Sequence, residues 1–153
     1  MFVPSHLLLA LVLFRALEST LADRNITIDD NDGAIKYSPG WSVSSGFNAL
    51  DYQGSHHLTD NKSATANFTF TGVAVYIMAP LWPFAVGAQA GVDGSSPVAI
   101  DMQDHTHTDP TEQAPEDVNT TVLWGMEGLT NSSHTLQISF WSIEDWMTLD
   151  AIM

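Results

Sequence analysis

The pattern of residues 64–70 constrains the fold of this chain more than any other feature. Apolar and polar side chains alternate over these seven positions, with Ala64, Ala66, Phe68 and Phe70 on one face and Thr65, Asn67 and Thr69 on the other. Because successive side chains of a β-strand point to opposite faces, the alternation predicts a strand with one face in a core and one in solvent.

Similar short runs of β-branched and aromatic residues recur along the chain, separated by Gly, Pro, Asn and Asp, whereas heptads and long helical stripes do not occur. The expected strands cover residues 25–28, 35–43, 64–70, 73–78, 86–92, 98–102, 118–124, 134–141 and 149–153. The pair Asp93-Gly94 predicts a hairpin, with a loop longer than the tightest type, and the apolar run 73–78 predicts a strand buried on both faces. We therefore predict an all-β fold, a two-sheet antiparallel β-sandwich.

The N-terminal segment is typical of a secretory signal peptide. Residues 1–22 contain an apolar run too short to span a bilayer and end in Thr20-Leu21-Ala22, which suits cleavage before Asp23. Residues 23–153 then have the size of a single domain. We expect an extracellular protein, secreted or at the cell surface, with no membrane insertion after signal removal.

Five sequons agree with that location, because Asn-x-Ser/Thr accepts N-linked glycans in secreted proteins. The predicted glycosylation sites are Asn25, Asn61, Asn67, Asn119 and Asn131. Cysteine is absent, so core packing alone must hold the domain together and thiolate zinc sites are excluded. The net charge of −14 repels phosphate backbones and anionic headgroups, which disfavours nucleic-acid binding and electrostatic membrane docking.

Catalytic motifs are missing: the sequence has no nucleophile elbow, P-loop, Rossmann fingerprint or His-Glu-x-x-His. Glu144 and Asp145, between Trp141 and Trp146, are the most suggestive carboxylate pair for a glycosidase. Consecutive residues in a turn rarely converge on one bond, however. We therefore predict that the protein is not an enzyme, with a glycoside hydrolase as the less favoured alternative.

Two groups of histidines are candidate ligand sites. Asp101, Asp104, His105, His107 and Asp109 crowd one strand end and the polar loop 104–117, where two imidazoles and a carboxylate would suit a divalent metal. The favoured interpretation is a solvated acidic loop, so the prediction is no metal and no cofactor. The adjacent pair His56-His57 points to opposite faces of an extended chain, so at most one of them would serve a site.

Sugar-binding surfaces combine aromatic rings with a few polar groups, because sugar C–H faces pack on rings while the hydroxyls form hydrogen bonds. The candidate ligand-binding residues are Trp82, Trp146, Tyr52, Asp104 and His105. Trp41 and Trp124 are assigned to the core instead.

The run from Ser63 to Ala79, followed by Asp93-Gly94, resembles the core of galactose-binding-like jelly rolls, in which an F-x-F-x-G strand pair precedes a hairpin with an Asp-Gly turn. Further segments are similar to the ectodomains of uncharacterised surface proteins from mushroom-forming fungi: residues 25–30, 49–51, 54–56, 80–83 and 122–125. The resemblance implies a jelly roll and brings no catalytic residues. Such ectodomains are commonly followed by a Ser/Thr-rich linker and a transmembrane helix, so it leaves open a secreted product or a truncated form of a membrane-anchored protein.

Together these features predict a glycoprotein domain that binds an extracellular carbohydrate or cell-wall polymer through its end loops, without catalysis. This functional step rests on analogy with the fold. The alternative is a structural or protein-interaction glycoprotein. The residues do not fix the ligand or the oligomeric state.

Overall fold

The computed structural model describes residues 24–108 and 114–153. The predicted signal peptide and Asp109 lie outside these residues. The described chain is all-β, with one short 3₁₀ turn, η1. Its elements are β1 (Ile28–Asp29), β2 (Ile35–Tyr37), β3 (Ser42–Val43), η1 (Tyr52–Gly54), β4 (His57–Thr59), β5 (Thr65–Leu81), β6 (Gly87–Val92), β7 (Val98–Asp101), β8 (Val118–Phe140), β9 (Met147–Leu149) and β10 (Ala151–Ile152).

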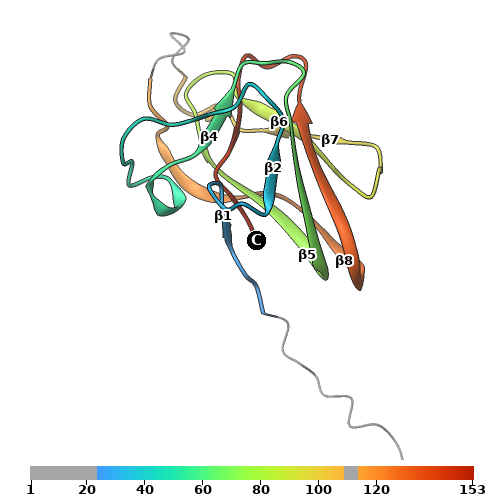
Figure 1. Ribbon diagram of the computed structural model, residues 1–153. Coiled ribbons are helices and arrows are strands. Elements are labelled where there is room, and N and C mark those ends of the chain that lie inside the picture. Colours follow the sequence, from blue (N-terminus) through green and yellow to red (C-terminus); the bar gives the residue numbers. More distant parts are fainter. Residues whose placement is uncertain (1–23, 109–113) are drawn as a thin grey trace, which may run out of the picture.

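Two long antiparallel strands, β5 and β8, organise the molecule (Figure 1). Their register shifts between Gly72 and Ala74, where residues 128–131 of β8 have no partner in β5. Both strands turn back at this end of the molecule, so the β5–β8 ribbon contributes to both layers (Figure 1). The sequence predicted two strands in each of these stretches. That was wrong because a bulge bends the ladder here without ending it.

The other strands pair with this ribbon or with one another. The larger sheet has the order β1-β10-β5-β8-β6-β7, with β2 also beside β5, and β3-β4-β9 form a second sheet. Every pair of neighbouring strands in the described chain is antiparallel. The prediction of a two-sheet antiparallel β-sandwich of the jelly-roll type is thus confirmed.

The core follows the predicted alternation up to the bulge. Ala66 and Phe68 are buried before it, and Val75 and Ile77 after it, so the buried positions change from even to odd numbers. The opposite face of the second half is only partly covered, because residues 74, 76 and 78 are half-buried. The prediction of a strand buried on both faces was therefore wrong. Trp41 and Trp124 pack against the core, as predicted.

The predicted hairpin forms between β6 and β7, whose pairing ends at Ala90 and Val98. Asp93 and Gly94 both have positive φ, of 53° and 75°, in the connecting loop. Glycine adopts this region without steric cost, and Asp is among the few other residues that tolerate it. The loop is longer than the two-residue type, as predicted.

Candidate functional site

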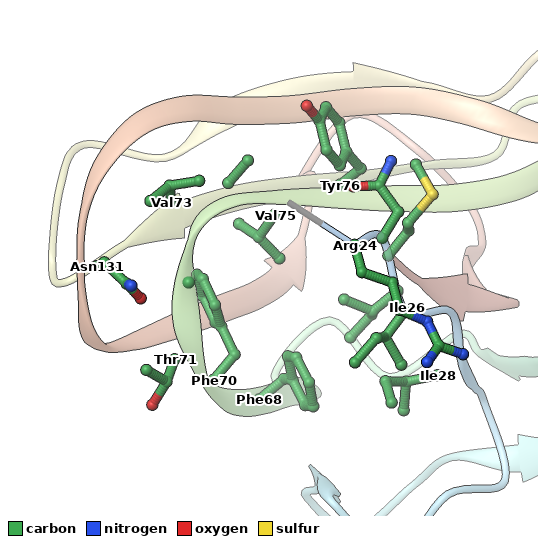
Figure 2. A pocket seen from close by; sticks show the side chains of 15 residues that line it. Arg24, Ile26, Ile28, Phe68, Phe70, Thr71, Val73, Val75, Tyr76 and Asn131 are labelled. Atoms are coloured by element: carbon green, nitrogen blue, oxygen red, sulfur yellow. The ribbon is translucent and has the colours of Figure 1, made fainter. Parts of the chain in front are cut away.

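A pocket of about 350 Å³ opens where β5 bends (Figure 2). Phe68 and Phe70 lie on one arm of the bend, and Val75 and Tyr76 lie on the other. The facing wall comes from Ile26, in the segment before β1, from Ile28 of β1 and from neighbouring residues. The bulge that separates the two arms therefore also creates the space between them.

The lining of the pocket combines aromatic rings with polar groups. The rings of Phe68 and Phe70 are nearly parallel, with centroids 6.0 Å apart. Arg24 and Thr71 add a guanidinium and a hydroxyl to the wall, and two of the predicted glycosylation sites, Asn25 and Asn131, also line it. Such a volume is typical of small-ligand sites, which start at about 300 Å³.

A second feature is a buried cluster of carboxylates and histidines. His56 Nδ1 lies 3.0 Å from Asp51 Oδ2 and 3.9 Å from Glu116 Oε1, and all three residues are buried. Asn48 donates a hydrogen bond from its side-chain amide to Glu116. The cluster joins segments far apart in the sequence, just before η1, β4 and β8. These three side chains are candidate metal ligands.

Two more buried carboxylates extend this cluster. His57 Nδ1 lies 2.6 Å from Asp30 Oδ2 beneath the ring of Tyr37, which stacks on the imidazole. Asp150, between β9 and β10, accepts hydrogen bonds from the Thr120 hydroxyl and the Tyr52 amide. His56 and His57 thus have different acidic partners, as their predicted opposite orientation requires.

Burial controls the ionisation of these groups, because it disfavours the charged form of a carboxyl. It raises the pKa of Asp30 and Glu116, and it raises the pKa of Asp150 to about 7. For His56 burial alone would lower the pKa, but the hydrogen bond and charge of Asp51 outweigh it and the pKa is raised. Asp150 therefore retains its proton up to near neutral pH.

The predicted sugar-binding residues do not form one open aromatic face. Trp82 is only 7% exposed, and its ring packs against His56 and Phe84 in the core. Burial leaves its ring faces closed to a ligand in this structure. Tyr52 is half-buried in η1, where its amide binds Asp150.

The remaining candidates lie at loops around β6 and β7. Trp146 is half-buried and its carbonyl accepts a hydrogen bond from the Gly87 amide. Asp104 donates its amide to the Trp82 carbonyl, at 2.7 Å, and His105 Nε2 lies 2.9 Å from Asp101 Oδ2. The assignment of these residues to a ligand-binding face stays a prediction.

The described residues of the Asp101–His107 group, and the pair Glu144 and Asp145, do not converge on one centre. His105 pairs with Asp101 at 2.9 Å and His107 pairs with Asp117 at 2.6 Å, so the two imidazoles have separate partners. Glu144 is buried beside Gly87, whereas Asp145 is exposed. Burial, followed by the charges of Asp101 and Asp145, raises the pKa of Glu144.

Sequence reasoning missed Glu116, which it placed in a solvated loop but which is 5% exposed. It also treated Phe68 and Phe70 as ordinary core residues. No local signal marks either site, because both depend on how β5 and the long loops fold together. The predicted sequon asparagines are exposed at residues 25, 61, 119 and 131, and Asn67 is half-buried.

The chain matches no known protein-family model, and no curated protein is similar to it in sequence. No helix in the described ranges is long and apolar enough to cross a membrane.

Solved structures with a similar fold include an exo-β-1,3-galactanase from Phanerochaete chrysosporium with galactose, at a TM-score of 0.58 and 13% identity. That match covers 85% of this chain and 29% of the galactanase. A GH26-CBM35 β-(1,4)-mannanase of Podospora anserina matches with a TM-score of 0.54 and 11% identity. The match covers 83% of this chain and 26% of the mannanase. A family two carbohydrate esterase from Cellvibrio japonicus matches with a TM-score of 0.51 and 14% identity. The match covers 83% of this chain and 32% of the esterase.

The chain therefore spans about a third or less of each of these proteins. At such low identities the likeness shows the fold alone. It agrees with the jelly-roll part of the predicted resemblance, while the fungal surface-protein family stays a prediction.

Proposed function

We propose that this domain binds an extracellular carbohydrate in the pocket at the bend of β5, and that it does so without chemistry. The observation that carries the proposal is the lining of the pocket, where the Phe68 and Phe70 rings meet polar side chains. Aromatic rings offer apolar faces to the C–H groups of a sugar, and the polar groups can pair with its hydroxyls.

The fold gives weaker support by analogy, since the proteins that share it are named for galactan, mannan or carbohydrate-ester substrates. Fold likeness alone does not establish function, and each of those proteins is much longer than this chain. Their enzymatic activities are therefore not part of the proposal. The predicted glycosylation and extracellular location are part of it, because both fit a partner outside the cell.

The proposal moves the binding face away from the residues that the sequence favoured. Trp82 is closed off in the core, whereas Phe70 is half-buried and lines the pocket. Trp146, which is half-buried, is the aromatic candidate at the loops around β6 and β7, a surface that we call the loop face. Comparing Phe70 with Trp146 therefore distinguishes the two surfaces.

The test is a glycan array and a cell-wall polysaccharide pull-down with the glycosylated domain of residues 23–153. Wild type is compared with Phe70→Ala, with Trp146→Ala, and with Phe47→Ala as a matched control, because the Phe47 side chain is 81% exposed and outside the pocket. Near-UV circular dichroism verifies that each variant is folded.

We expect saturable binding that weakens about tenfold or more in Phe70→Ala, since a lost aromatic contact is worth roughly 1 kcal/mol beyond its buried area. The Phe47 and Trp146 variants should bind as wild type does. Loss confined to Trp146→Ala would transfer the site to the loop face. If the folded wild type binds no glycan at all, the proposal of carbohydrate binding is wrong. That result would favour the alternative of a structural or protein-interaction glycoprotein.

A further inference from the structure

We propose that Asp51, His56 and Glu116 form a binding site for a divalent transition-metal ion, with Zn²⁺ as the best match. Their ligand atoms lie within 4.8 Å of one another. Zinc bonds to nitrogen and oxygen are about 2.0–2.2 Å long, which separates neighbouring ligand atoms by about 3–4 Å. The separations of 3.0 and 3.9 Å from His56 Nδ1 to the two carboxylates agree with this geometry.

An unsatisfied oxygen supports a bound cation at this place. Asp51 Oδ1 has no hydrogen-bond partner among the described residues, although the Asp51 side chain is fully buried. Asp150 Oδ1, whose carboxylate interacts with the charge of Asp51, is also buried without a partner in that part of the chain. A buried polar atom left unpaired is costly, and a carboxylate oxygen more so. A cation bound at the Asp51 carboxylate would satisfy Asp51 Oδ1.

The charge of the surroundings points the same way. Four buried carboxyls, on Asp30, Asp51, Glu116 and Asp150, share this region with two imidazoles. The described basic side chains contact other groups: Lys36 donates to the Gly33 carbonyl, Lys62 donates to the Glu144 carbonyl, and Arg24 lines the pocket. The four carboxyls outnumber the two imidazoles, and none of the described basic side chains pairs with them. A divalent ion would neutralise that excess.

The ligand types select among divalent ions. Calcium and magnesium prefer oxygen ligands throughout, whereas an imidazole with two carboxylates suits zinc and its neighbours in the first transition row. The Asn48 amide already fixes Glu116 from the outside, as a supporting hydrogen bond around a metal ligand does. Metal binding would tie the loop before β4 to the segment before β8.

The test uses the intact domain after treatment with EDTA. Calorimetric titration with ZnCl₂ measures affinity and stoichiometry, and melting curves measure stabilisation, with MnCl₂ and CaCl₂ titrated in parallel. The diagnostic variant is Glu116→Gln, which retains an acceptor for Asn48. The matched control is Asp101→Asn in the exposed Asp101–His105 pair.

We expect one zinc ion per domain, a higher melting temperature with zinc, and at least tenfold weaker binding in Glu116→Gln but not in Asp101→Asn. Replacing zinc by Co²⁺ should give visible absorption bands, and zinc should shift the imidazole resonances of His56. These two readouts use the wild type, so they test the site even if the variant does not fold.

A wild-type domain that takes up no zinc would overturn the proposal, and so would zinc binding that survives in folded Glu116→Gln. Preference for calcium over zinc would also contradict it. Sugar binding is measured separately, so the two proposals can fail independently.

Discussion

The buried carboxyl of Asp150 leads to a defined pH dependence of stability. Its side chain is 0% exposed, and burial raises its pKa from the ordinary value of 3.8 to about 7. Hydrogen bonds from Thr120 and Tyr52 favour the ionised form but do not outweigh the burial. The metal-free folded domain therefore retains a proton that the unfolded chain releases near pH 4.

This difference in proton binding stabilises the folded state at low pH. The stabilisation is complete below the unfolded pKa of about 3.8 and is lost as the pH rises toward the folded pKa of about 7. A difference of about three pH units, at about 1.4 kcal/mol per unit, makes the contribution about 4 kcal/mol. That is a large share of the stability of an ordinary domain, which is about 5–15 kcal/mol.

The perturbation is Asp150→Asn, because an amide resembles the neutral carboxyl and still accepts hydrogen bonds from Thr120 and Tyr52. Urea denaturation in EDTA from pH 4 to pH 7 measures the free energy of unfolding. We expect wild type to lose about 3 kcal/mol relative to the variant over this range, most of the full effect. The exposed Asp60→Asn control should follow wild type. Parallel curves for wild type and Asp150→Asn would refute the reasoning, since they would mean that Asp150 titrates alike in both states.

Two further predictions concern packing. Gly87→Ala should destabilise the domain by roughly 1–3 kcal/mol, because the added Cβ would lie 2.8 Å from the Ile100 carbonyl oxygen. Gly33→Ala, which meets no atom within 4 Å, is its control, and equal melting temperatures for the two variants would contradict the prediction. Leu136→Ala should cost about 2–5 kcal/mol in urea denaturation, because this fully buried side chain leaves a cavity. Val122→Ala, at a position that is 42% exposed, should cost much less, and a comparable loss would show that burial does not set the effect.

The strands could be predicted from the sequence wherever polar and apolar residues alternate. Residues 64–70 and 134–140 show this pattern, and all of them except Ala64 lie in β5 or β8. Within β5 the alternation changes after Phe70, because the bulge near Gly72 changes which positions face the core. The local sequence therefore predicts that a strand ends at this interruption. In the structure β5 continues, because it pairs with β8 on both sides of the bulge.

The sites were harder to predict because each combines distant segments. The pocket depends on the bend that brings Phe70 and Val75 around one space (Figure 2). The carboxylate–histidine cluster depends on Glu116 meeting Asp51 and His56, although it follows them by about half the length of the domain. Nothing in the polar composition around Glu116 distinguishes a buried carboxylate from a solvated one.

The topology also sets the order in which this chain can fold during synthesis. Thr65 of β5 pairs with Ser139 of β8, and Ile28 of β1 pairs with Ile152 of β10. A ribosome must therefore deliver almost the whole domain before either pairing can form, and such non-local contacts fold slowly, in milliseconds to seconds. Asn67 lies within β5, where its amide oxygen accepts a hydrogen bond from Gln137 of β8. An enzyme that modifies Asn67 would find it most accessible after β5 is synthesised and before β8 is available to pair with it.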